Sequence, residues 1–157
     1  MVEIVSFKRE YASIFSDLNL AWLKKYFYVE PKDLLLLENC QEHILDKGGH
    51  IFIALLNKQP VGCFSFIPLS PKVYELGKMA VSKNFQGEKI GQQLLSFGIA
   101  FAKKQNWKKI ILYSSTKLPT ALYIYRKYGF KTIALEKDLP YARSDIKMEL
   151  NLMNKIL

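Results

Sequence analysis

Apolar and polar residues alternate along the first third of the chain in patterns that predict one strand and two helical regions. Residues 2–7 form a short apolar run that is typical of a strand. From 11 to 27, large apolar residues recur at roughly the helical period, which predicts a helix. A second helical region begins with Pro31 and Asp33, continues past residue 45 and ends at the pair Gly48-Gly49.

The middle of the chain predicts three successive strands followed by a helix. The segments HIFIALL (50–56) and VGCFSFIPL (61–69) are separated by the turn residues NKQP, which is typical of a β-hairpin. VYELGKMAV (73–81) predicts a third strand, and a polar loop with two glycines follows it. Apolar residues then recur at helical spacing over 90–106, where three small residues would let the helix pack close to a sheet: Gly91, Gly98 and Ala102.

The last third predicts a strand at 108–114, a helix at 119–128 and two strands at 131–136 and 145–152. The helix has Pro119 at its start and Gly129 just past its end, as helices prefer. The order of elements is β-α-α-β-β-β-α-β-α-β-β. We therefore expect residues 1–157 to form a single α/β (α+β) domain. Its central, twisted and mostly antiparallel sheet would have about seven strands, flanked by about four helices.

Composition limits the protein class. The 157 residues suit one ordinary domain, and half of them are hydrophobic, enough for a substantial core. Charges interrupt every apolar stretch before it reaches a membrane-spanning length, and the N-terminus lacks the apolar core of a signal peptide. Cys40 and Cys63 have no metal-like spacing and cannot make a disulfide framework. We expect a cytoplasmic protein without a membrane partner and without a metal.

The chain is basic, with 23 Lys and Arg against 14 Asp and Glu and a net charge of +9. That balance favours an anionic partner. The lysines are scattered in pairs, however, and no basic block alternates with exposed aromatic residues. Nucleic acid is therefore disfavoured as the main partner.

The glycine loop between the third strand and the next helix has the parts of an anion site. Helix N-termini carry unpaired N–H groups and partial positive charge, and glycines let a ligand approach the backbone. The segment Gln86–Gly91 fits that use, but it matches neither the Walker loop nor the Rossmann fingerprint. The alternative is a tight turn whose glycines serve packing only.

The element order, this loop and the segment ALYIYRKYGF together resemble the GNAT superfamily of N-acetyltransferases. The segments YELGKMAV (74–81) and YARSDIKMEL (141–150) also resemble a subgroup of small bacterial GNAT proteins. Gln86 and Gly91 match the ends of the family's loop pattern. The MAV of residues 79–81 matches the strand before that loop. The family's late motif, Ala-x-x-x-Tyr-x-x-x-Gly-Phe, is matched by Ala121, Tyr125, Gly129 and Phe130.

The resemblance implies acetyl-CoA as co-substrate and direct transfer of its acetyl group to a primary amine in a ternary complex. It implies that loop amides hold the pyrophosphate, here those of Gln86, Gly87, Glu88, Lys89, Ile90, Gly91 and Gln92. It also implies that the preceding strand lines the pantetheine arm through Met79, Ala80 and Val81. Two positions depart from the family pattern: Lys89 occupies the first glycine position, and Leu118 stands where many relatives have asparagine.

The chemistry needs a base, because only about one alkyl amine in a thousand is unprotonated at neutral pH. Glu75, inside an otherwise apolar strand, is our candidate base, directly or through a water. The alternative is a solvent-facing carboxylate on a strand edge. Tyr125 occupies the family's tyrosine position and is the candidate acid for the leaving sulfur. A core aromatic is the alternative for Tyr125, as for its neighbours Tyr123 and Tyr128.

Several points stay open at the level of the sequence. Arg143 is a candidate for binding a substrate carboxylate from the last loop, or it is a solvated loop charge. His43 and His50 have no partner at a telling spacing, which favours surface or capping roles. The acceptor is a small-molecule or peptide amine of unspecified identity, and a homodimer stays open. The competing functions are a CoA-binding protein of this fold without transferase turnover and, less favoured, a basic nucleic-acid-binding module.

Overall fold

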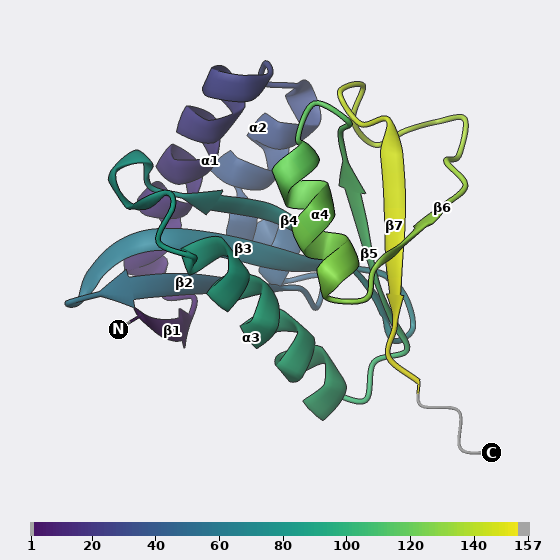
Figure 1. Cartoon of the computed structure of the whole chain (residues 1–157). Coiled ribbons are helices and arrows are strands. Elements are labelled where there is room, and N and C mark those ends of the chain that lie inside the picture. Colours follow the sequence, from purple (N-terminus) through teal and green to yellow (C-terminus); the bar gives the residue numbers. More distant parts are fainter. Residues whose placement is uncertain (1, 154–157) are drawn as a thin grey trace.

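Seven strands form one sheet through the middle of the molecule (Figure 1). The structure, a computed structural model, describes residues 2–153. The strand order is β1-β2-β3-β4-β5-β7-β6, in which β4 and β5 run parallel and the other five neighbouring pairs are antiparallel. The strands are β1 (Val2–Ser6), β2 (His50–Leu56), β3 (Gln59–Ser70), β4 (Val73–Val81), β5 (Lys109–Ser114), β6 (Lys131–Ile133) and β7 (Ile146–Asn151). The predicted mostly antiparallel sheet is confirmed.

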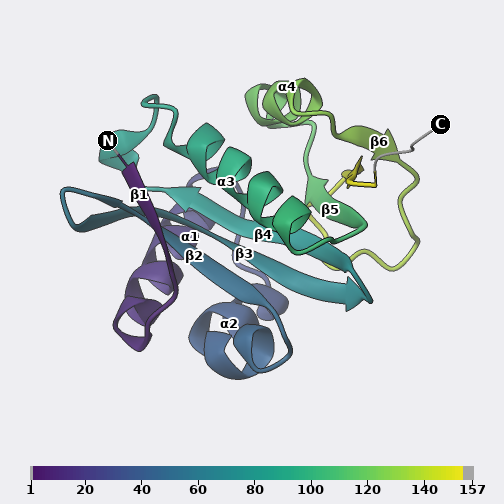
Figure 2. The same ribbon diagram turned by 90° about the horizontal axis from the view of Figure 1, so that it is seen from below.

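Helices cover both faces of this sheet. Figure 2 shows α1 and α2 on one face and α3 and α4 on the other. The helices are α1 (Ala12–Tyr26), α2 (Pro31–Glu38), α3 (Ile90–Lys104) and α4 (Pro119–Lys127), with short helical turns η1 (Arg9–Tyr11), η2 (Gln41–Leu45) and η3 (Lys83–Phe85). None of these helices within 2–153 is both long and apolar enough to cross a membrane.

The alternation of side chains along the central strands divides the interior into two cores. In β2, Phe52 joins the core under α3, whereas its neighbour Ile53 joins the core under α1 and α2. In β3, Phe64 and Cys63 separate in the same way, since successive strand residues point to opposite faces. Helix α3 lies close to the sheet at Gly98, where a Cβ would stand 3.1 Å from the Phe64 ring.

Strands β4 and β5 pair only at their beginnings. Their three paired positions run from Val73 opposite Lys109 to Glu75 opposite Ile111. Beyond that point β5 continues along β7, and the rest of β4 stays with β3. The sheet therefore opens between its two central strands, and this opening positions the site described below.

Three expectations from the sequence need correction. The second helical region ends at Glu38 and resumes as the wide turn η2, because Asn39 adopts φ −130° and ψ 50°. The strand expected over 131–136 ends at Ile133, where its pairing with β7 ends. His50 is half-buried in an aromatic cluster rather than exposed: its ring lies 5.0 Å from that of Phe101 between centroids, and burial lowers its pKa.

Candidate active site

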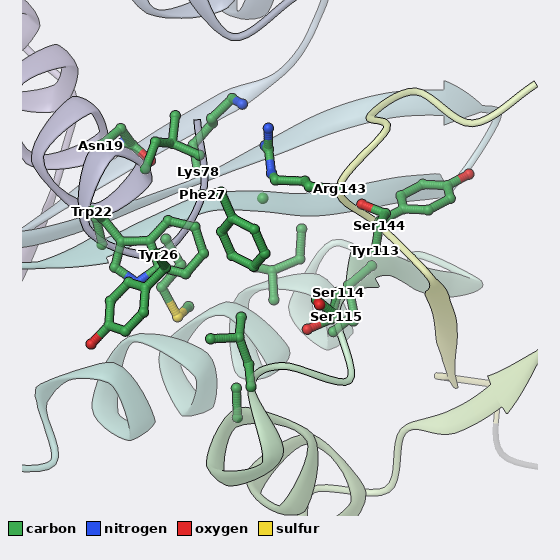
Figure 3. A pocket seen from close by; sticks show the side chains of 18 of the residues that line it. Asn19, Trp22, Tyr26, Phe27, Lys78, Tyr113, Ser114, Ser115, Arg143 and Ser144 are labelled. Atoms are coloured by element: carbon green, nitrogen blue, oxygen red, sulfur yellow. The ribbon is translucent and has the colours of Figure 1, made fainter. Parts of the chain in front are cut away.

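A cavity of about 400 Å³ lies where β4 and β5 separate. Its wall includes residues of β4 and β5, of α1 on one face of the sheet and of α4 on the other (Figures 2 and 3). The loop between β6 and β7 closes one side with Tyr141, Arg143 and Ser144. Because helices from opposite faces share the wall, the cavity passes through the sheet.

The β4 edge in this cavity is distorted by a bulge at Lys78. Lys78 has φ 52°, and between Gly77 and Ala80 the strand has two residues opposite one residue of β3. Side chains of β3 hold the displaced carbonyls: Ser65 Oγ donates to the Gly77 oxygen at 3.1 Å, and Cys63 Sγ to the Lys78 oxygen at 3.5 Å. From Leu76 onward the described part of β5 offers β4 no strand partner. This length of main chain is therefore available to a bound molecule.

Glu75 lies in the cavity wall, at the last position of β4 that pairs with β5. The residue is 6% exposed, so the alternative of a solvent-facing edge carboxylate is wrong. Burial raises the pKa of Glu75, and the positive charges of Lys32 and Lys78 only partly offset that effect. Among the described residues, no hydrogen bond reaches its carboxylate. The cavity thus contains one buried carboxyl group that is free to interact with a ligand.

The two cations of the wall, Lys78 and Arg143, pair with carboxylates at the start of α2. Asp33, at the start of α2 and fully buried, lies 2.5 Å from Lys78 Nζ. It also accepts two hydrogen bonds from Arg143, at 2.7 and 2.9 Å. Arg143 Nη1 in addition donates to Glu30 Oε2 at 3.0 Å. Two cations therefore face two carboxylates, and this buried network ties α2 to the β4 bulge and to the last loop.

The network also encloses Tyr141. Its ring lies 4.5 Å from Lys78 Nζ and 4.2 Å from Arg143 Cζ, both measured to the ring centroid, which favours both cations. Glu30 holds the same loop, because its Oε1 accepts a hydrogen bond from the Ala142 amide at 2.8 Å. Arg143 is thus not a solvated loop charge. It does reach the cavity, but its guanidinium already binds two protein carboxylates, and its role toward a substrate stays a prediction.

An aromatic wall from α1 faces this charged network. It consists of Trp22, Tyr26 and Phe27, which stand together beside the cavity in Figure 3. The Trp22 ring lies 5.5 Å from that of Tyr26 and 5.7 Å from that of Phe27. Tyr26 is 40% exposed although it is large and apolar. Exposed apolar surface in a cavity is typical of a binding site.

Tyr125 lines the cavity from α4, while Tyr123 and Tyr128 of the same motif do not. Tyr123 is 68% exposed. Burial raises the pKa of Tyr125, so its hydroxyl is protonated at neutral pH. Within residues 2–153 that hydroxyl has no hydrogen-bond partner. Its ring packs 5.9 Å from Phe130, which fixes the direction of the side chain.

The glycine loop precedes α3 beside the cavity, and Gln86 belongs to both. Lys89 has φ 61°, so a lysine adopts the left-handed conformation at the position where the family has glycine. The amides of 87–92 donate to no acceptor in the described part of the chain, and Gln93 is the first to donate, to the Lys89 carbonyl. A Cβ on Gly91 would meet nothing closer than 4.0 Å. A Cβ on Gly91 would thus make an ordinary contact with Val81 of β4, so the close approach of α3 to the sheet does not require glycine at this position.

Sequence reasoning missed Asp33, Lys78 and the aromatic wall as parts of the site. One signal was available for Lys78, because a lysine inside an apolar strand needs a counter-charge. No local pattern identifies Asp33 as that partner, since it lies 45 residues away. The described residues contain no group of three or more His, Cys, Asp or Glu placed to hold a metal ion.

Comparison with known proteins identifies the family to which the chain is similar. A family model described as an acetyltransferase (GNAT) domain matches residues 47–132. The uncharacterized N-acetyltransferase YvbK of Bacillus subtilis (strain 168) is 28% identical over 112 residues, which are 69% of this chain and 72% of that protein. Several other curated N-acetyltransferases are longer, and the chain spans 27–58% of their length.

Two solved structures show the same fold. A GNAT-family acetyltransferase of Staphylococcus aureus Mu50 has a TM-score of 0.85 and 28% identity, covering 98% of this chain and 100% of that one. The PaiA N-acetyltransferase of Thermoplasma acidophilum, solved in complex with coenzyme A, has a TM-score of 0.76 and 18% identity. The match covers 96% of this chain and 99% of that one.

Proposed function

The chain belongs to the GNAT family of acetyltransferases, and on that premise we propose that it moves the acetyl group of acetyl-CoA directly to a primary amine. The observation that carries this proposal is the cavity between β4 and β5, which passes through the sheet. A donor can enter from the α3 and α4 face and an acceptor from the α1 and α2 face, so the two meet without a covalent enzyme intermediate.

The residues present fit a coenzyme A moiety. The amides of 87–92 and the partial positive charge of the α3 N-terminus suit its pyrophosphate. Lys89 adds an exposed ammonium at the same place. The main chain of Met79, Ala80 and Val81 has no strand partner on its β5 side, which suits the amides of the pantetheine arm. When bound, acetyl-CoA supplies a thioester, which is already activated for attack by an amine.

Glu75 and Tyr125 have complementary roles in this proposal. Glu75 takes a proton from the incoming ammonium, directly or through a water, and its raised pKa makes it a better base than an exposed carboxylate. Main-chain N–H groups around the Lys78 bulge stabilise the developing oxyanion. Tyr125, which stays protonated, donates to the leaving sulfur.

Two other functions are distinguished by experiment. A CoA-binding protein without turnover would bind acetyl-CoA and release no thiol with any amine. A nucleic-acid-binding module would show salt-sensitive binding to DNA or RNA and none to CoA. Cys40 and Cys63 are both buried free thiols, which agrees with a reducing compartment such as the cytoplasm.

The test measures acetyl-CoA binding by calorimetry and thiol release with a panel of amines. Glu75→Gln should lower kcat by about 10²–10⁴-fold, while the Kd for acetyl-CoA stays within about twofold. The same variant should melt at a higher temperature at pH 7. A carboxyl whose pKa is raised by folding destabilises the fold above its ordinary pKa of 4.5, and glutamine removes that penalty.

The matched control is Glu42→Gln, which changes an exposed glutamate outside the cavity and should match the wild type in both assays. Absence of acetyl-CoA binding by the wild-type protein would refute the proposed function. Unchanged kcat in Glu75→Gln, with chemistry limiting the rate, would remove Glu75 alone from the mechanism.

A further inference from the structure

The acceptor side of the cavity has a definite chemical character. Resting on the proposed function, we propose that the acceptor is a monoamine with an aromatic body: its ammonium binds Glu75 and its ring binds the aromatic wall of Trp22, Tyr26 and Phe27. Three features of the cavity wall carry this inference. It has one unpaired carboxylate, its two cations are already paired with protein carboxylates, and aromatic rings at the end of α1 face the cavity.

Glu75 is the one carboxylate among the described residues that line the cavity. It is more than nine-tenths buried and accepts no hydrogen bond from the rest of the described chain. A single ammonium would satisfy it. A polyamine would bring further ammonium groups next to Lys78 and Arg143 with no carboxylate left for them, and an unpaired buried charge is costly. The site therefore selects one positive charge.

The cations of the wall are not available to an acceptor carboxylate. Both terminal nitrogens of Arg143 donate to Asp33, and one of them also to Glu30. Lys78 Nζ is held by Asp33, and the Lys78 side chain is 5% exposed. An α-amino acid would have to break this network to place its carboxylate. The network therefore favours an amine without an acid group.

The aromatic wall supplies the remaining specificity. Its three rings come from the last turn of α1 and its C-cap, and the Trp22 ring is tilted at 47° to that of Tyr26 and at 44° to that of Phe27. Tilted neighbouring rings leave faces and edges on which a further ring can pack at the usual centroid spacing. Tyr26 is 40% exposed, and a bound ring packed against it would remove part of that surface from water. Glu75 and this wall line the same cavity, so one small molecule reaches both.

The experiment compares four acceptors with acetyl-CoA: 2-phenylethylamine, ethylamine, phenylalanine and spermidine. Relative to 2-phenylethylamine, ethylamine lacks only the ring and phenylalanine adds only a carboxylate. Spermidine lacks the ring and carries additional positive charges, so its comparison with ethylamine isolates the effect of charge. We expect kcat/KM for 2-phenylethylamine to exceed that for ethylamine by roughly 10- to 100-fold, from burial of the ring. Phenylalanine and spermidine should be poorer than 2-phenylethylamine by at least a similar factor.

Variants and a binding readout complete the test. Trp22→Ala should raise KM for 2-phenylethylamine about 10-fold and leave KM for ethylamine unchanged. Phe27→Leu keeps apolar bulk, removes a ring and serves if Trp22→Ala does not fold. Tyr28→Ala is the control, since Tyr28 is 58% exposed and outside the cavity. Calorimetry on CoA-saturated protein measures 2-phenylethylamine binding without turnover.

The outcomes separate this inference from the function on which it rests. Preference for spermidine or phenylalanine, or equal use of ethylamine and 2-phenylethylamine, would overturn the aromatic monoamine and leave the transferase intact. Thiol release with none of the four, together with 2-phenylethylamine binding that Trp22→Ala weakens, would support the pocket and refute turnover. No turnover and no amine binding would overturn both.

Discussion

Asp33→Asn tests the buried charge network that shapes the cavity. Asp33 is 0% exposed and accepts three hydrogen bonds from Lys78 and Arg143, besides one from the Glu30 amide at 2.9 Å. Asparagine keeps the shape of the side chain but removes its charge. Its NH₂ group is a donor, and it would face a donor of Lys78 or Arg143 at a position where the carboxylate oxygen accepts a hydrogen bond. Breaking a buried ion pair on one side costs about 3–5 kcal/mol. That is about a fifth or more of the 5–15 kcal/mol that stabilises a typical domain.

Urea unfolding measures this cost. With a slope of about 2 kcal/mol per molar, the midpoint should fall by roughly 2 M while the slope stays unchanged. Burial alone would raise the pKa of Asp33, but the hydrogen bonds from Arg143 and the charge of Lys78 outweigh burial and lower it. The carboxylate's contribution is therefore complete above its ordinary pKa of 3.8 and is lost only as pH falls through the lower folded value. The difference between variant and wild type should be constant from pH 5 to 8.

A double-mutant cycle tests the pairing itself. Lys78→Met removes the cation that Asp33 holds at the bulge, so adding it to Asp33→Asn should cost less than it costs in the wild type. The coupling should lie within about 0.5–3 kcal/mol. Asp46→Asn is the control: Asp46 is exposed, accepts a bond from Gln41 at 2.8 Å and should change the midpoint little. An Asp33→Asn protein whose free energy of unfolding lies within about 1 kcal/mol of the wild-type value would refute this reasoning.

Three further predictions address the loop and the proposed acid. Gly91→Glu should fold, because a Cβ there comes no closer than 4.0 Å to a neighbouring side chain, yet lose acetyl-CoA binding by calorimetry, whereas Gly91→Ala should keep most of it; unchanged affinity of Gly91→Glu would reassign the loop. Lys89→Gly should keep or raise the melting temperature, since lysine at φ 61° costs roughly 1–2 kcal/mol. If the Lys89 ammonium contacts a phosphate of CoA, the same variant should also show a weaker dependence of CoA affinity on salt concentration. Tyr125→Phe should lower kcat by about 10²–10⁴-fold with little change in cofactor affinity, and Tyr123→Phe should match wild type; a near-normal kcat would exclude Tyr125.

The periodicity of the sequence was sufficient to predict most elements and their order. The strands over 50–56 and 73–81 begin and end where the apolar runs do. Helix α4 begins at Pro119 and ends before Gly129, whose φ of 100° suits glycine. These features depend on residues close together in the chain, so a local window contains the information. Helix α3 likewise begins at the residue expected, Ile90.

Part of the candidate site was also accessible from the sequence, through the family resemblance. Glu75 and Tyr125 both line the cavity, although their proposed roles await the tests above. The resemblance did not reveal what surrounds them. Trp22 appeared only as one apolar position of a helix, and its place in the aromatic wall follows from how α1 lies against the opened sheet.

Tertiary structure alone decided the character of the acceptor side. Asp33 and Arg143 are 110 residues apart, and they meet because α2 and the β6–β7 loop close on the same bulge of β4. The bulge itself depends on register with β3, and the cavity on the three-residue pairing of β4 with β5. Local propensity favours helix or strand within a short window. It contains no information about which distant charge neutralises Lys78, and that pairing leaves Glu75 as the carboxylate free for a ligand.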